Sequence, residues 1–206
     1  MEKYTSPEET LTEIRQLMER SSRFISLSGF SGVFAGVYAL LGAAAAFYYL
    51  DSADHARAYS DNTHRSDVVV FLAADAFLVL ILAVGTGILL TTRKAKKDGN
   101  SLLDAAAKKL LINLSIPLVT GGIFCLALIY HGNTFYVAPA TLIFYGLALV
   151  HASKYTRDDV RSLGMAEIAL GVISLFIVGY GLLFWALGFG ILHIAYGTYM
   201  YYKYER

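Results

Sequence analysis

Six apolar runs divide the chain, and polar or charged residues gather between them. Each run is close to the roughly 20 residues that an α-helix needs to cross the ~30 Å hydrocarbon core of a bilayer. A helix satisfies its backbone hydrogen bonds internally, as lipid requires. The pattern therefore predicts an all-α, polytopic membrane bundle of six transmembrane helices. The runs lie at about residues 24–50, 68–90, 110–130, 137–153, 163–180 and 183–202.

The six runs pair into three antiparallel hairpins, at about residues 24–90, 101–153 and 156–202. In each hairpin the first helix carries a glycine followed by a β-branched, a bulky and a small residue and then leucine. The second helix carries a glycine before a basic membrane edge. We expect a pseudo-threefold repeat of one hairpin; the alternative is that apolar helices resemble one another by chance. The paired glycines are Gly36 with Gly85, Gly122 with Gly146, and Gly171 with Gly197.

Residues 1–23 precede the first run and have an amphipathic helical pattern. The stretch that starts at Ser6 places a hydroxyl three residues before a carboxylate, which resembles a capping box at a helix start. We expect residues 1–23 to form a cytoplasmic lead-in helix and residues 24–206 to form a single six-helix transmembrane domain. The apolar stripe of the lead-in consists of Leu11, Ile14, Leu17 and Met18.

Charge distribution predicts how the bundle is oriented. Hydrophobic residues make up 56% of the chain and charged residues 16%, against about 25% charged residues in a soluble domain. All but Arg57 and Arg65 of the 17 lysines and arginines lie in residues 1–23, 91–109, 152–162 and the C-terminal tail. Lysine and arginine collect at cytoplasmic helix ends. Six spans bring these segments to one side, so we expect both termini in the cytoplasm of a bacterial inner membrane protein.

Small residues form smooth faces on several of the predicted helices. Gly29, Gly32 and Gly36 recur at spacings of three and four residues, for example. Such faces allow two helix backbones to approach closely. We therefore expect tight helix packing within the chain or between copies in a homo-oligomer; a role as hinges is the alternative. The predicted packing glycines are Gly29, Gly32, Gly36, Gly85, Gly122, Gly146, Gly171, Gly190 and Gly197.

Three ionisable residues within the predicted helices are the candidates for chemistry, because charged groups in hydrocarbon are costly and usually functional. They are Asp75 near the outer end of the second helix, Glu167 one turn inside the fifth, and His193 at mid-depth of the sixth. We expect Glu167 and His193 on neighbouring helices at different depths, linked by water or by Tyr196. The set favours either a polar relay for protons or a small solute, or separate interhelical hydrogen bonds.

The outer loop at residues 51–67 is dense in potential metal ligands. Zinc favours histidine and carboxylate ligands of this kind. Alternatively, histidines outside the membrane would change charge near pH 6.5 and sense acid, or the loop is simply solvated. The candidate ligands are Asp54, His55, His64 and Asp67, with His131 from the second outer loop.

Familiar enzyme signatures are absent from the sequence: it has no GxSxG, HExxH, phosphate-binding loop or dinucleotide fingerprint. We therefore expect no enzymatic activity and no cofactor. The basic segment 91–109 favours contact with anionic lipid head groups, and no other feature points to nucleic acid. The expected partners are membrane lipid, a second copy of the chain, and a proton or small solute.

The glycine pairs Gly36/Gly85, Gly122/Gly146 and Gly171/Gly197, in three short hairpins with both termini inside, resemble the HdeD-type bacterial membrane proteins associated with acid resistance. The resemblance implies a stress-linked membrane role and transfers no catalytic residue. The chain departs from it in its long outer loop and its intramembrane ionisable residues. Two function classes remain: a small transporter or channel for protons or a small solute, or a structural, regulatory or stress-linked membrane protein that acts through helix packing and partners.

Overall fold

The structure of the protein is a computed structural model, which describes residues 28–51, 65–97 and 105–206. The structure is 92% helix, with no strand in the described residues. The all-α fold class predicted from the apolar runs is therefore confirmed. The predicted lead-in helix at residues 1–23 lies outside the described residues.

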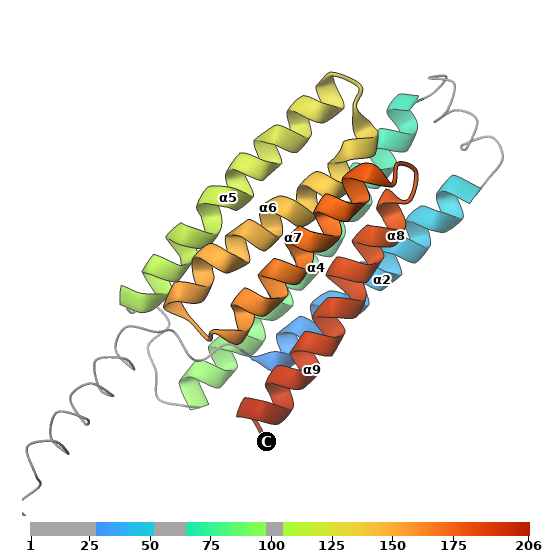
Figure 1. The fold of residues 1–206 in the computed structure, drawn as a ribbon. Helices are drawn as coiled ribbons and strands as arrows, with labels where there is room; N and C mark the ends of the chain where they lie inside the picture. The colour runs from blue at the N-terminus through green and yellow to red at the C-terminus, as the bar shows by residue number, and fades with distance from the viewer. Residues whose placement is uncertain (1–27, 52–64, 98–104) are drawn as a thin grey trace, which may run out of the picture.

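Six helical segments follow one another along the described part of the chain (Figure 1). The first five are α2 (Gly29–Asp51), α4 (Arg65–Lys97), α5 (Ala105–Tyr130), α6 (Val137–Ala152) and α7 (Asp159–Phe176). The last is composite and consists of α8 (Gly181–Trp185), the π-helix η3 (Ala186–Leu192) and α9 (His193–Tyr204). Short 3-10 turns, η1 (Thr134–Tyr136) and η2 (Ser153–Tyr155), flank α6.

Within the described residues, five segments are long and apolar enough to cross a membrane: Gly29–Asp51, Asp67–Lys97, Ala105–Tyr130, Thr134–Tyr155 and Gly181–Tyr204. The exception among the described helices is α7, which has 18 residues and carries Asp159, Arg161 and Glu167. It also ends at Phe176, earlier than predicted. A turn follows, in which Gly179 adopts a φ of 96°, a conformation that glycine tolerates and other residues rarely adopt.

The helices pack in a chain of contacts that crosses the predicted hairpins. Helix α6 contacts both α5 and α7, and α2 contacts both α4 and the last helix. The most extensive contacts join α6 to α7 and α2 to the last helix as a whole (Figure 1). The two members of the third predicted hairpin, α7 and the last helix, meet mainly through α8 and η3.

Glycines allow these helices to touch backbone to backbone. A Cβ on Gly197 would lie 2.6 Å from the Val33 nitrogen and 2.7 Å from the Gly29 oxygen. At the α6–α7 contact, a Cβ on Gly146 would lie 2.6 Å from the Gly164 oxygen. The glycine-rich start of α2 is therefore helical because it faces another backbone, as small-residue packing requires.

Seven of the nine predicted packing glycines lie against another helix: Gly29, Gly32, Gly36, Gly146, Gly171, Gly190 and Gly197. The other two do not. Gly85 and Gly122 are exposed, and a Cβ on either would meet no atom within 4 Å in the described structure. On α5 the neighbouring Gly121 makes the contact instead, against Phe144. The face of α5 that meets α6 is therefore offset by one residue from the predicted face. It contains Gly121 and Cys125 rather than Gly122.

Candidate functional site

The candidate site lies where the last helix changes its winding. His193 is the first residue of α9 and directly follows the π-helix η3. Wide π-helical turns are rare in proteins and often lie at functional sites. Gly188, within this turn, is buried, and a Cβ on it would lie 2.5 Å from Oε2 of Glu167. The absence of a side chain at Gly188 therefore leaves space for the Glu167 carboxyl group of α7.

Both ring nitrogens of His193 have partners. Nδ1 lies 3.0 Å from the Gly188 oxygen and Nε2 lies 2.8 Å from the Tyr145 hydroxyl. A carbonyl oxygen only accepts hydrogen bonds, so Nδ1 carries the hydrogen in this arrangement. In the neutral ring the Tyr145 hydroxyl then donates to Nε2. Protonation of the ring would reverse that bond, because both nitrogens of an imidazolium donate.

Glu167 is the most unusual group in the site. Its side chain is 0% exposed, and its Oε1 lies 3.4 Å from His193 Nδ1. Neither carboxyl oxygen has a hydrogen-bond partner among the described residues. A buried carboxylate costs several kcal/mol unless it is paired or holds a proton itself. We call Tyr145, Glu167, Gly188 and His193 the central cluster; it offers one proton two adjacent carriers, the Glu167 carboxyl and the His193 ring.

Tyr145 was not among the candidate residues chosen from the sequence, although it completes the cluster. Its ring lies 5.4 Å from the ring of His193, and Phe189 lies 5.0 Å from Tyr145 and 5.9 Å from His193. A signal for Tyr145 was present: a tyrosine directly precedes the repeated glycine in both Tyr145-Gly146 and Tyr196-Gly197. Aromatic rings thus cover the imidazole on the side of α6.

The structure corrects two expectations about the intramembrane polar groups. The prediction that Glu167 and His193 lie at different depths is wrong, because the two side chains are in direct contact. Helix α7 runs from Asp159 to Phe176, so Glu167 lies near its middle rather than one turn from its start. Tyr196 does not link them; its hydroxyl is buried and has no hydrogen-bond partner in the described part of the chain. Asp75 packs at the α2–α4 contact, where a Cβ on Gly42 would lie 3.2 Å from its carboxylate.

The candidate metal ligands are only partly within the described residues. Asp54, His55 and His64 lie outside them. Asp67 and His131 are both exposed. No group of three or more histidine, cysteine or carboxylate side chains that could hold a metal ion lies within residues 28–51, 65–97 and 105–206.

A second polar cluster joins the start of α7 to the end of α9. Asp159 accepts hydrogen bonds from Lys203, at 3.0 and 2.9 Å, and from the Tyr204 hydroxyl, at 2.6 Å. The guanidinium of Arg157 lies 3.5 Å from the centre of the Tyr204 ring. Burial raises the pKa of Asp159, but the hydrogen bonds from Tyr204 and Lys203 outweigh it, so this pKa lies below its usual value. We call Arg157, Asp159, Lys203 and Tyr204 the terminal cluster.

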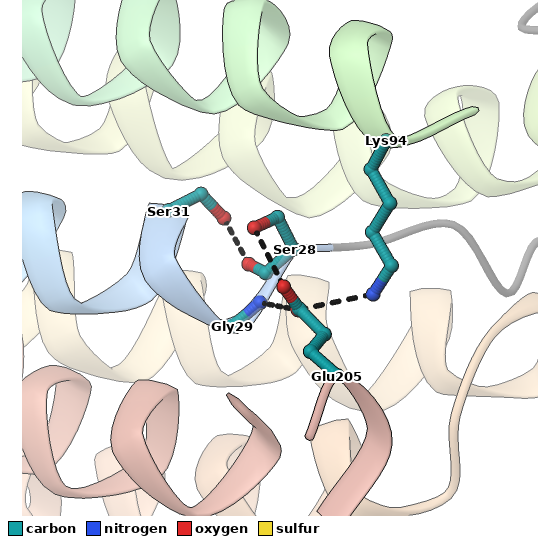
Figure 2. A network of polar contacts seen from close by, with 5 residues as sticks. All are labelled: Ser28, Gly29, Ser31, Lys94 and Glu205. Carbon is teal, nitrogen blue, oxygen red and sulfur yellow. Dashed lines mark hydrogen bonds and ion pairs between the residues drawn. The ribbon is translucent and has the colours of Figure 1, made fainter. Parts of the chain in front are cut away.

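Next to this cluster, Glu205 fastens the start of α2 to the end of α4 (Figure 2). Its carboxylate accepts the backbone N–H of Gly29, lies 3.5 Å from the Ser28 hydroxyl, and pairs with Lys94 at 3.0 Å. A carboxylate at a helix N-terminus satisfies free N–H groups and interacts favourably with the helix dipole. The starts of α2 and α7 and the ends of α4 and α9 therefore meet at one end of the bundle.

Comparison of the chain with protein-family models, with curated proteins and with solved structures finds no match.

Proposed function

We propose that the protein is a small integral membrane transporter or channel for protons or a small solute, and that the central cluster is its site. The observation that carries the proposal is the state of Glu167. Its carboxyl group is buried, has no hydrogen-bond donor in the described structure, and lies 3.4 Å from a histidine ring. Groups that only join helices are usually satisfied by their partners. A carboxyl group that exchanges a proton with a neighbouring imidazole must not be held by other hydrogen-bond donors, which would account for its lack of partners.

The proposal includes all six helical segments as membrane spans, in three hairpins with pseudo-threefold similarity. Helix α7 has 18 residues, which corresponds to about 27 Å, slightly short of the ~30 Å hydrocarbon core. Its polar residue Glu167 is shielded, because it faces η3 rather than the outside of the bundle. The terminal cluster and Glu205 hold the starts of α2 and α7 beside the ends of α4 and α9. These helix ends lie on one side of the membrane only if the number of crossings between them is even.

The same end of the bundle is the cytoplasmic one in this proposal. Lysines and arginines gather there, at the end of α4, between α6 and α7, and at the C-terminus, and such residues favour the cytoplasmic side. Large apolar side chains on the outer faces of α4 and α5 are exposed, as lipid contact requires; among them are Leu80, Ile81, Ile88, Ile112, Ile116 and Ile123. We place the protein in a bacterial inner membrane, with both termini inside.

A second candidate function is a non-transporting structural, regulatory or stress-linked role through helix packing. The observation that favours it is the backbone contact of α2 with α9 at Gly29, Gly32 and Gly197. Such contact gives a rigid bundle whose outer faces are free for lipid or another copy. In that case the central cluster would only hold α6, α7 and the last helix together.

Proton flux in sealed proteoliposomes separates the two candidates. Vesicles with an internal pH dye would be given a pH gradient and a potassium diffusion potential, with wild-type protein and with Glu167→Gln and His193→Gln. We expect flux from the wild type that both variants lose. His151→Gln is the matched control, because His151 is an exposed histidine of α6 outside the cluster.

Three results would count against transport through the central cluster. The first is the absence of flux from folded wild-type protein, for protons and for small ions or neutral solutes. The second is wild-type flux from both central variants. The third is equal loss in His151→Gln, which would indicate a general defect of the reconstituted protein.

A further inference from the structure

The proposed site does not include the Tyr196 hydroxyl or the terminal cluster. Tyr196 follows His193 by three residues on α9, about 4.5 Å along the helix axis. Its ring packs against Leu149 of α6 and against Val160 and Leu163 of α7. Its hydroxyl is buried without a hydrogen-bond partner in the described residues. Hydrophobic packing accounts for the ring but not for a buried, unpaired hydroxyl, which costs about 1–3 kcal/mol.

The register of α7 against α9 places Tyr196 between the two clusters. Glu167 contacts His193 at 3.4 Å, and Asp159 contacts Lys203 at 2.9 Å. The two carboxyl groups are eight residues apart on α7, about 12 Å along its axis. Tyr196 lies within this interval on α9, and its ring packs against the cluster that contains Val160, the residue directly after Asp159 on α7.

We propose that the transported species is the proton and that it passes between the central cluster and Asp159 along the α7–α9 interface, by way of the Tyr196 hydroxyl. This inference rests on the proposed function, since it names the cargo and one half of its path. It differs from the relay expected from the sequence, because Asp75 has no part in it and Asp159 is its terminal group.

The steps require only O–H and N–H bonds to break and form in turn. Glu167 or protonated His193 releases a proton toward the Tyr196 oxygen. Water carries the proton wherever the distance between the two groups is longer than a hydrogen bond. The tyrosine accepts that proton on oxygen as its own O–H bond breaks, so the phenol is unchanged after each transfer. The released proton reaches Asp159, whose side chain is 20% exposed, and passes to solvent.

The surroundings of Asp159 suit a terminal group. Lys203 and Arg157 place positive charge beside it, and Lys203 and the Tyr204 hydroxyl donate to its oxygens. These groups favour the ionised carboxylate. A proton that arrives is therefore bound weakly and released quickly, and Asp159 is ready to accept the next one.

Proton flux in proteoliposomes tests the path with two matched pairs of variants. Tyr196→Phe removes the hydroxyl and keeps the packed ring, whereas Tyr202→Phe makes the same change at an exposed tyrosine of α9. We expect Tyr196→Phe to lower the rate on the order of 100-fold, as loss of a positioned proton-transfer group does. We expect Tyr202→Phe to match the wild type.

The second pair separates the Asp159 carboxylate from the ion pair that it forms. Asp159→Asn and Lys203→Met both break the ion pair with Lys203, but only the first removes the carboxylate. We expect Asp159→Asn to abolish most of the flux and Lys203→Met to lower it less, because the proton-accepting carboxylate remains but releases its proton more slowly. Size-exclusion profiles and thermal unfolding in detergent establish that each variant is folded.

The outcomes keep the inference distinct from the proposed function. If wild-type protein shows no proton flux, the proposed function fails, and this inference with it. If wild-type flux depends on Glu167 but Tyr196→Phe and Asp159→Asn retain it, the central site stands and the path to Asp159 is wrong. If Lys203→Met loses flux as completely as Asp159→Asn, the ion pair rather than the carboxylate is required, and Asp159 is not the terminal group.

Discussion

The central and terminal clusters use similar side chains in opposite ways. Each contains one carboxylate and one tyrosine hydroxyl from neighbouring helices. In the terminal cluster, Asp159 receives three hydrogen bonds, from Lys203 and Tyr204, and is partly exposed. In the central cluster, Glu167 is fully buried and receives none from the described residues. The difference indicates that the terminal carboxylate contributes to stability, whereas the central carboxylate is retained at a cost to stability.

The largest expected effect follows from removing the central carboxylate. In Glu167→Met a flexible apolar side chain replaces a buried group that lacks donors, and His193 keeps its bonds to Tyr145 and Gly188. A buried polar group without a hydrogen bond costs about 1–3 kcal/mol, and more when it is charged, and an apolar side chain of similar size removes that cost. We expect the free energy of unfolding in detergent to rise by such an amount. A fall of similar size would show that the Glu167 carboxyl group is satisfied in the native protein.

The next largest effect concerns the space that η3 provides for Glu167. In Gly188→Ala the new methyl group would lie 2.5 Å from Glu167 Oε2 and from Leu142. Overpacking of this kind lowers the free energy of unfolding by about 1–3 kcal/mol. Gly85→Ala is the matched control, because Gly85 has open space around it. There we expect a gain of up to about 1 kcal/mol from helix propensity, and equal losses at both sites would argue against a specific role for Gly188.

A smaller effect is expected at Glu205, where the chain end fastens α2 and α4. Glu205→Gln keeps an acceptor for the Gly29 N–H but loses the charge that pairs with Lys94. We expect the free energy of unfolding to fall by about 0.3–1 kcal/mol, the usual range for a charge at a helix terminus. Hydrogen exchange should become faster in the first turn of α2 and remain unchanged in α5, which Glu205 does not contact in the described structure.

The smallest effect is the pH dependence of the terminal cluster. The pKa of Asp159 in the folded protein is lowered from 3.8. The stabilising contribution of this carboxylate is therefore present above the pKa of the unfolded chain and is lost as the pH falls through the lower folded-state pKa. For a partly exposed pair we expect about 0.2–1 kcal/mol. Unfolding measured from pH 7 to pH 3 should show a loss in the wild type that Asp159→Asn lacks; the same pH dependence in both would assign it to other groups.

Much of the fold was predictable because membrane helices leave a strong signal in sequence. Long apolar runs predicted the helices, and the glycine spacing of Gly29, Gly32 and Gly36 predicted a close-packed face. The choice of neighbours was harder. Helix α7 packs most extensively on α6 and α9 on α2, because glycines on these faces match across hairpins. Gly85 and Gly122 resembled the packing glycines in sequence, but which face of a helix meets a neighbour depends on rotation about its axis.

The site was predictable in its residues but not in its geometry. Glu167 and His193 were evident as ionisable residues in apolar surroundings. Helix α7 begins and ends about four residues earlier than the apolar run predicted, so Glu167 lies near its middle and meets His193. The predicted bounds of the run had placed the two side chains at different depths. The tyrosine before the repeated glycine marked Tyr145 in the sequence, but its contact with the His193 ring is a result of three-dimensional packing.

The most direct test of the central claim is to measure proton flux and unfolding on the same preparation of Glu167→Met. We expect a protein that is more stable than the wild type and that carries no protons, because the carboxyl group costs stability and is required for transport. A variant that unfolds as the wild type does and retains wild-type proton flux would contradict the account.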